Sequence, residues 1–313
     1  MDNGLMIETK GLTKTFGDFT AVDGIDLAVK KGSIHGFVGP NGAGKTTTIK
    51  MLIGSIRSTS GEGFIKGHEA GSLEARKSVG YSPEHPFFYE DMAAFDYLVY
   101  MARVCGVKRK QSQERATELL KWLDLGDFSW SKVGGFSAGM KQRLSLAQAL
   151  IHEPELLILD EPTANMDPTG RLSILDKLQQ LSEERKATTF LSSHILSELE
   201  QVVDSLTMIN NGRIVVQGDI NDLKKRFAEN HFLLKTSQNE AVLETVGAKE
   251  CVREGWIDAE GFIHLVSEDG DALRREIAKA VAQNNALMEH LSEERASLQD
   301  IYRKTMGLEE EQP

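Results

Sequence analysis

The sequence predicts an α/β protein with a largely parallel central sheet, followed by a small α+β domain. Short β-type runs alternate with helical patterns between residues 6 and 218, as in domains whose parallel strands are joined by helices. The run at 156–159 is wholly apolar and is bounded by charge, which is typical of a central strand buried on both faces. The strand-like runs of this part include residues 34–38, 156–159, 188–191 and 205–209.

The composition limits the classes of protein that need to be considered. A chain of 313 residues is long enough for about two domains. Its net charge of −11 argues against a broad nucleic-acid surface, because phosphate binding needs an excess of Lys and Arg on one face. Cys105 and Cys251 stand far apart, so we expect neither a disulfide framework nor a four-ligand zinc site. No apolar run approaches the roughly 18 residues that span a bilayer, and we expect a chain that is neither membrane-spanning nor secreted.

Two domains are expected, over residues 5–218 and 219–313. Within the first, about 86–150 is predicted to be a helical insert, since apolar residues recur at helical spacing. The second is more acidic, with 20 acidic and 12 basic residues. Its pattern predicts helices from Asn239, Asp271 and Ser297 and strands near 231–235, 252–258, 262–266 and 287–290. This order resembles a split βαβ, or ferredoxin-like, unit.

A glycine-rich loop follows the strand-like run 34–38 and precedes a helical run. Its glycines let backbone N–H groups converge on a polyphosphate, and the helix N-terminus adds partial positive charge. The spacing matches the P-loop pattern, in which Lys45 reaches the terminal phosphates and Thr46 offers its hydroxyl to Mg²⁺. The sequence therefore predicts a nucleoside triphosphate site made by Gly39, Pro40, Asn41, Gly42, Ala43, Gly44, Lys45, Thr46 and Thr47.

Two carboxylates come at the carboxyl end of the buried run 156–159. Asp160 is placed to hold Mg²⁺, and Glu161 is placed to polarise the water that attacks the γ-phosphate. Downstream, His194 follows another predicted strand and is expected at the same sheet edge, within reach of a phosphate. Together they predict hydrolysis of the nucleotide.

A further helix is predicted to begin at residues 136–143. Ser137 is a suitable N-cap, and Leu144, Leu146, Ala147 and Leu150 form the buried side. Alone, this stretch is only a capped helix.

Taken in order, these motifs resemble those of the nucleotide-binding subunit of the ATP-binding cassette (ABC) family, over nearly all of residues 5–218. Residues 39–46 are similar to its Walker A loop, 136–140 to its signature helix, and 156–161 to its Walker B strand. Residues 164–167 are similar to its D-loop and His194 to its switch histidine. Phe16 stands where the family carries an aromatic residue that stacks on adenine; the alternative is a core aromatic at a strand end.

The resemblance implies a P-loop NTPase fold with an antiparallel β subdomain and a helical insert. It also implies that two cassettes, in a homodimer or a heterodimer, meet head to tail around ATP and Mg²⁺. Ser137 and Gly139 of one copy would then face the γ-phosphate held by the other, which suits a helix N-terminus. In this scheme Lys45, Glu161 and His194 are catalytic.

Some positions depart from the family pattern. Glu84 stands where a glutamine that ligates Mg²⁺ is usual; a carboxylate can still ligate the ion, but when ionised it cannot donate a hydrogen bond. The signature helix has Ala138 and Met140 in place of glycine and glutamine, and the D-loop has Asn165 in place of glycine. We expect these changes to alter the rate of hydrolysis without abolishing it.

The resemblance further implies a peripheral subunit on the cytoplasmic face of the membrane, bound to a separate multi-span permease, with no nucleic acid. The layout is most similar to prokaryotic exporter-type subunits. The aromatic residues at 87–89, with Tyr97 and Tyr100, either anchor a permease helix or pack the insert's own core. The alternatives are a soluble ABC-type ATPase acting on the ribosome or DNA and, in another class, a small-molecule kinase. The second domain is expected to be a dimer-stabilising appendage or a regulatory module.

Overall fold

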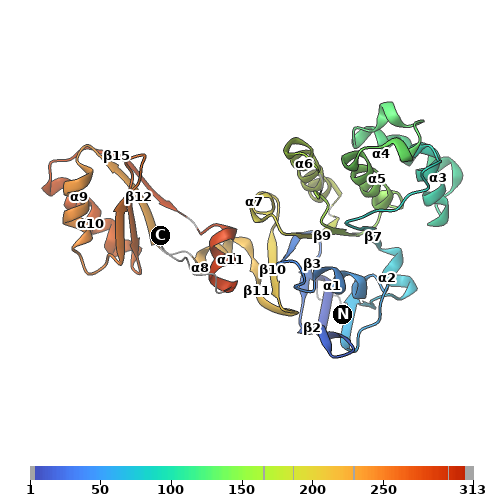
Figure 1. Ribbon diagram of the computed structural model, residues 1–313, viewed down its shortest axis with the longest axis horizontal. Helices are drawn as coiled ribbons and strands as arrows, with labels where there is room; N and C mark the ends of the chain where they lie inside the picture. The colour runs from blue at the N-terminus through green and yellow to red at the C-terminus, as the bar shows by residue number, and fades with distance from the viewer. Residues whose placement is uncertain (1–3, 165, 186, 228–229, 295, 307–313) are drawn as a thin grey trace. The chain divides into compact units, whose positions relative to one another are not determined.

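The computed structural model describes residues 4–164, 166–185, 187–227, 230–294 and 296–306 (Figure 1). The chain divides into two compact units, Met1–Ile220 and Asn221–Pro313. Within the described residues, no helix combines the length and the apolar character that crossing a membrane requires.

The first unit is built on a six-stranded sheet with the order β11-β10-β4-β9-β8-β7. All neighbouring strands are parallel except β10 and β11. Every residue of β4, β8 and β9 is buried, as the apolar run at 156–159 predicts for central strands. The largely parallel sheet is therefore confirmed. Its strands are β4 (Ile34–Val38), β7 (Val79–Ser82), β8 (Leu156–Asp160), β9 (Thr188–Ser193), β10 (Ser205–Asn210) and β11 (Arg213–Asp219).

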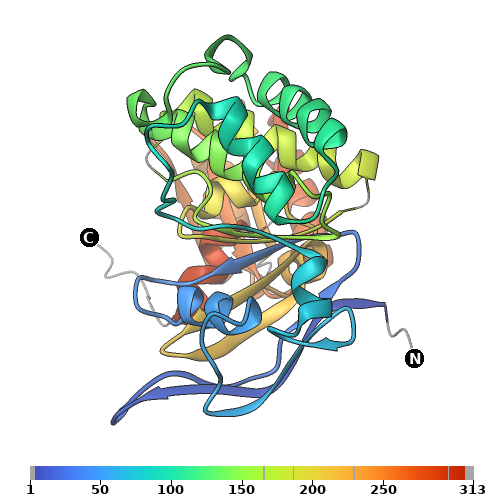
Figure 2. The ribbon, with the colours of Figure 1, turned by 90° about the vertical axis from the view of Figure 1, so that its right-hand side faces the viewer.

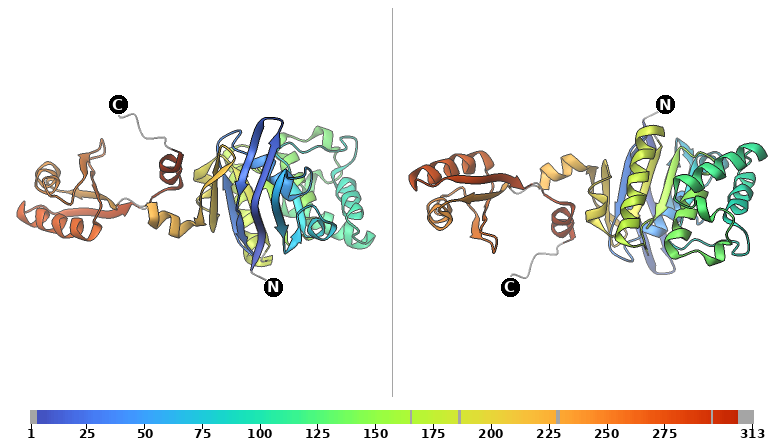
Figure 3. Two further views of the ribbon diagram at one scale, coloured as in Figure 1. Left: turned by 90° about the horizontal axis from the view of Figure 1, so that it is seen from below. Right: turned by 90° about the horizontal axis from the view of Figure 1, so that it is seen from above.

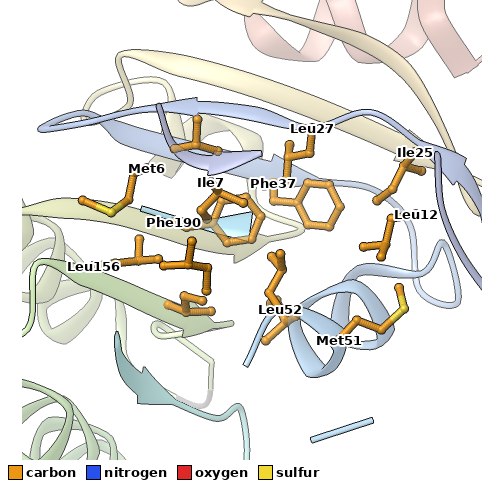
Figure 4. Close-up of a cluster of buried hydrophobic side chains, with 14 of the residues drawn as sticks. Met6, Ile7, Leu12, Ile25, Leu27, Phe37, Met51, Leu52, Leu156 and Phe190 are labelled. Atoms are coloured by element: carbon orange, nitrogen blue, oxygen red, sulfur yellow. The ribbon is translucent and has the colours of Figure 1, made fainter. Parts of the chain in front are cut away.

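An antiparallel sheet forms a second layer, with β1 and β2 running side by side in Figure 3. Between the two sheets lies the main core, where Phe37 and Phe190 pack among side chains of β1, β2 and α1 (Lys45–Leu52) (Figure 4). The ring centroids of these two residues are 5.2 Å apart. The strands are β1 (Leu5–Phe16), β2 (Phe19–Ile25), β3 (Ala28–Lys30), β5 (Ser60–Ile65) and β6 (His68–Glu69), and α2 (Leu73–Lys77) follows them.

The helices drawn in green lie across the central sheet from the blue antiparallel strands (Figure 2). They are α3 (Ala94–Val104), α4 (Arg109–Trp122) and α5 (Ala138–Leu150), with short turns η1 (Gly126–Phe128) and η2 (Val133–Gly135) between α4 and α5. The segment 86–93 contains no helix, so helical structure begins later than the sequence pattern suggests. Tyr97 of α3 donates a hydrogen bond to Gln148 of α5, which ties these two helices together. Helices α6 (Pro168–Arg185) and α7 (Leu196–Leu199) precede and follow β9.

The second unit contains a four-stranded sheet with the order β13-β14-β12-β15, antiparallel throughout. Between the first and the last helix of this unit, the elements follow one another as β-α-β-β-α-β, the order of a split βαβ unit. Alternate residues Phe232 and Leu234 of β12 are buried in one core with Val242 of α9 and Ile277 of α10. The elements are α8 (Ile220–Phe227), β12 (Asn230–Thr236), α9 (Asn239–Gly247), β13 (Glu254–Ile257), β14 (Ile263–Ser267), α10 (Gly270–Gln283), β15 (Met288–Glu294) and α11 (Leu298–Met306).

A buried histidine in the central sheet makes stability depend on pH. His35 of β4 hydrogen-bonds Ser205 Oγ through Nδ1 at 2.7 Å and Thr207 Oγ1 through Nε2 at 2.8 Å. Burial lowers the pKa of His35 from 6.5 to about 3. As the pH falls below 6.5 the unfolded chain takes up a proton that the folded chain does not, so the free energy of unfolding falls toward pH 3.

We therefore expect the substitution His35→Gln, which keeps a hydrogen-bonding side chain but does not titrate, to weaken this dependence. Between pH 7 and pH 5.5 the variant should lose about 1 kcal/mol less stability than the original chain. Urea unfolding followed by circular dichroism measures the difference, and the exposed His68, changed to Gln in the same way, is the control. Equal losses in the His35 variant and the original chain would contradict this explanation.

Candidate functional site

The predicted phosphate loop lies between β4 and α1, at the carboxyl end of the central strand. Two of its glycines are required by the close packing around them. A Cβ at Gly39 would lie 2.2 Å from the carbonyl oxygen of Ile209, and one at Gly44 would lie 2.6 Å from that of Ala21. Gly44 also has a φ of 108°, in the left-handed region that favours glycine. Any residue with a side chain at Gly39 or Gly44 would therefore clash with the backbone beside the loop.

Lys45 begins α1 and turns its side chain back into the loop. Its Nζ donates to the carbonyl oxygens of Gly39 at 2.7 Å and Pro40 at 3.3 Å. The same ammonium lies 3.7 Å from Oε1 of Glu161, and both side chains are buried. A buried charge is tolerated where it has partners, and Lys45 has three oxygen atoms around it.

Glu161 connects the loop to the histidine. While Oε1 faces Lys45, Oε2 lies 2.8 Å from Nδ1 of His194. The histidine ring is more than half exposed, whereas the carboxylate is buried. The three residues predicted to be catalytic are thus in one chain of contacts, although they are far apart in the sequence.

These side chains open onto a cavity of about 440 Å³ at the edge of the sheet. Ten residues predicted for the site line it, and two that were not predicted, Phe19 and Ala21, complete it. Gly39 and Ala43 are buried within the phosphate loop. The ten are Pro40, Asn41, Gly42, Gly44, Lys45, Thr46, Thr47, Glu84, Glu161 and His194.

Oxygen ligands suited to Mg²⁺ come together at this cavity. Thr46 and Glu84 line it, and Asp160 is the buried neighbour of Glu161 at the end of β8. Asp160 Oδ1 accepts a hydrogen bond from Ser192 Oγ at 2.6 Å. Burial and the nearby charge of Asp160 together raise the pKa of Tyr81 to about 12. Hydroxyl and carboxylate oxygens are the donors that Mg²⁺ prefers, so the residues fit this ion.

The signature-helix residues are not among those that line this cavity. Ser137 caps α5 by accepting a hydrogen bond from the backbone N of Met140 at 3.3 Å. At Gly139 an added Cβ would meet only Met166, at 3.7 Å, so the packing within this chain does not require glycine there.

The segment after Glu161 is fixed to the helices on either side of β9. Asp167 caps the start of α6 by accepting from the backbone N of Gly170 at 2.9 Å, and this bond holds the pKa of Asp167 below its usual range. Arg171 of α6 binds Glu198 of α7, which also accepts from Thr163 Oγ1 at 3.2 Å. Asn165 lies outside the described residues.

Two aromatic residues face each other at the end of the β1–β2 hairpin. Phe16 and Phe19 are directly paired, with exposed fractions of 50% and 64%, so Phe16 is not part of a core. The ammonium of Lys14 lies 5.0 Å from the centre of the Phe16 ring and also donates to Arg57 O. Phe19 lines the cavity. The family motif points to Phe16 alone. The sequence signal for Phe19 is that it is also aromatic and stands directly across a tight turn from Phe16.

The sheet, the glycine loop and the carboxylates at its edge define a P-loop NTPase. Comparison with known proteins identifies the family within the P-loop NTPases. The family model for the ABC transporter matches residues 22–164. The chain is 36% identical to the bacitracin transport ATP-binding protein BcrA of Bacillus licheniformis, over 96% of this chain and 97% of that protein. The chain belongs to the ABC transporter family, as an ATP-binding subunit.

Other relatives agree with this assignment. The ABC transporter ATP-binding protein YxlF of Bacillus subtilis, itself uncharacterised, is 35% identical over 83% of this chain and 82% of its own length. A solved ATP-binding subunit of an ABC transporter matches with a TM-score of 0.65 and 30% identity, over 71% of this chain and 93% of that one. A dimeric cassette solved with ADP and Pi, MJ0796, shares the fold with a TM-score of 0.63, 23% identity and coverages of 69% and 99%. As an ATP-binding subunit of this family, the chain is an ATPase cassette.

The two aromatic residues can be distinguished by their effect on nucleotide affinity. We expect Phe19→Ala to raise the Kd for ATP about fivefold or more, since stacking on a base contributes about 1–3 kcal/mol. Phe16→Ala should have a smaller effect, and Phe19→Trp should retain affinity. Titration of each purified variant with ATP measures the difference. A larger loss in Phe16→Ala would instead assign the base contact to Phe16.

Proposed function

We propose that this chain hydrolyses ATP between two cassettes and thereby drives export through a separate membrane permease. The observation that carries the chemistry is the position of Glu161, whose carboxylate lies between Lys45 and His194 at the nucleotide cavity. Transport is supported by similarity over nearly the whole chain to proteins named for bacitracin transport, in Bacillus licheniformis and, at 35% identity, in Enterococcus faecalis. Export as the direction of transport is part of the proposal.

In the proposed reaction Glu161 accepts a hydrogen bond from the attacking water and polarises this water for attack on the γ-phosphate. Lys45 exchanges its loop carbonyl contacts for phosphate oxygens and stabilises the charge that develops on them. His194 holds the γ-phosphate and the water in register through its contact with Glu161. Thr46, Asp160 and Glu84 would hold Mg²⁺, which would neutralise further charge on the phosphates.

A second cassette is part of the proposal because Ser137 and Gly139 are not among the residues lining this chain's cavity. The N-terminus of α5 does not face the nucleotide cavity of its own chain, and a helix N-terminus is suited to bind the γ-phosphate held by another copy. ATP that touches both copies would then favour the closed dimer by mass action. The partner is either a second copy of this chain or a related cassette.

The permease contact is proposed at the aromatic residues before and within α3. Tyr97 is buried and packs edge-on against Phe88, with ring centroids 5.3 Å apart, so this pair belongs to the insert's own core. Phe87, Tyr89 and Tyr100 are exposed, Phe87 by 93%. Exposed aromatic residues of this kind are typical anchors for a partner helix. The chain would then work as a peripheral subunit on the cytoplasmic face of the membrane.

We expect Glu161→Gln to retain ATP binding while lowering the rate of hydrolysis about a hundredfold or more, because an amide cannot act as a base. The stalled variant should form a dimer that depends on ATP, measured by sedimentation. Adding Gly139→Asp to it should prevent the dimer by placing a carboxylate against phosphate. Glu183→Gln, on the exposed side of α6, is the matched control. Normal hydrolysis in Glu161→Gln would remove this residue from the mechanism.

Lys45→Ala tests the phosphate loop independently, since it removes the only side-chain ammonium among the residues lining the cavity. We expect the affinity for ATP itself to fall at least tenfold, because the charge-assisted contacts with the terminal phosphates are lost. Unchanged ATP binding in this variant would count against the assignment of the loop.

Affinity capture from gently solubilised membranes tests the transport assignment. We expect a multi-span membrane protein in near-equal amounts, and we expect its loss when Phe87 and Tyr89 are both changed to Ser. Leu172→Ser, which alters an exposed apolar residue of α6, is the control that should keep the partner. Recovery of ribosomal or DNA-bound proteins without a membrane partner would favour a soluble ABC-type ATPase.

A further inference from the structure

Ser192 of β9 is a fully buried serine whose hydroxyl lies between two residues of the site. Its Oγ donates to Asp160 Oδ1 at 2.6 Å and accepts from the backbone N of Glu161 at 3.0 Å. The parallel register of β8 and β9 pairs Asp160 directly with Ser192, so the two side chains share one face of the sheet. One hydroxyl therefore touches both consecutive acidic residues.

The direction of each hydrogen bond is fixed by chemistry. An ionised carboxylate only accepts, and a backbone N–H only donates. The single hydroxyl proton of Ser192 must therefore point at Asp160, while a lone pair receives the N–H of Glu161. Because the serine is buried, water does not compete for these two contacts.

The backbone of Glu161 gives this contact a further role. Glu161 has a φ of 49°, in the left-handed region that is uncommon for residues other than glycine. Such a conformation is unfavourable for a residue with a side chain and persists where surrounding contacts hold it. The N–H to Ser192 is one such contact, and the resulting turn aims the Glu161 side chain between Lys45 and His194.

We propose that Ser192 is a positioning residue that aligns Asp160 for Mg²⁺ and Glu161 for the attacking water. This inference rests on the function proposed above. Residues that orient a metal-ligating carboxylate from behind typically change metal affinity or activity by 10- to 100-fold when they are removed. Ser192 acts through Asp160 and Glu161 and is not among the residues that line the cavity.

The decisive variant is Ser192→Ala, tested first by metal binding without turnover. In the presence of a non-hydrolysable ATP analogue, Mn²⁺ binding followed by electron paramagnetic resonance should weaken about tenfold or more. The half-saturating Mg²⁺ concentration for ATP hydrolysis should rise in parallel, and kcat should fall. Affinity for the analogue without divalent metal should stay within about twofold, since the phosphate loop is unchanged.

A matched control lies on the same strand. Thr189 is also fully buried in β9, and its Oγ1 has no hydrogen-bond partner among the described residues. Thr189→Val removes a buried hydroxyl at nearly constant volume, so we expect its Mn²⁺ affinity and kcat to match the original chain. Ser192→Thr restores the hydroxyl and should recover most of the loss, while Ser192→Cys, a weaker donor of similar size, should be intermediate.

Unchanged Mn²⁺ affinity in Ser192→Ala would overturn the proposal, as would an equal loss in Thr189→Val. Thermal unfolding shows whether Ser192→Ala is folded, and if it is not, the Ser192→Cys variant decides between the same two results. Failure of the proposed function would be seen in a different experiment. Normal hydrolysis in Glu161→Gln would show that Glu161 is not the base, and the Mn²⁺ measurements on the Ser192 variants could still be interpreted.

Discussion

Three parallel strands end at one level, and the site depends on that register. β4 and β9 pair Val38 with Ser193, and β8 and β9 pair Asp160 with Ser192. The residue that follows β4 is Gly39, the first of the phosphate loop. Glu161 follows β8, and His194 follows β9. Parallel strands leave their carboxyl ends on the same side of a sheet, which is where α/β proteins bind their ligands. A slip of one residue in either pairing would turn a side chain of the site to the other face of the sheet.

The same register places several charges in the protein interior, where each needs compensation. Lys45, Asp160 and Glu161 are all buried. The ammonium of Lys45 faces a carboxylate and two loop carbonyl groups, and Asp160 accepts a hydrogen bond from the Ser192 hydroxyl. Removing one member of a buried charge pair leaves the other uncompensated, at a cost of several kcal/mol. Stability and chemistry at this edge are therefore coupled.

The sequence alone was sufficient for the features that depend on local pattern. The glycine spacing and the apolar run at 156–159 predicted the loop and the central strand, and both lie where expected. Contacts made across the fold needed the structure. Ser192 looks like any strand serine until the pairing of β8 and β9 is known. The place of Phe19 at the cavity became clear only from the fold, and helical spacing further along did not reveal that residues 86–93 contain no helix.

The contacts of Lys45 make the loop selective before any base is recognised. The ammonium acts as an internal ligand of the loop, held by the carbonyl oxygens of Gly39 and Pro40 and facing Glu161. An incoming anion competes with these contacts for the ammonium. A small monovalent ion offers too few oxygen atoms to compete, whereas a triphosphate also engages the backbone N–H groups of the loop. The contacts of Lys45 thus favour a polyphosphate over a small monovalent anion at this loop.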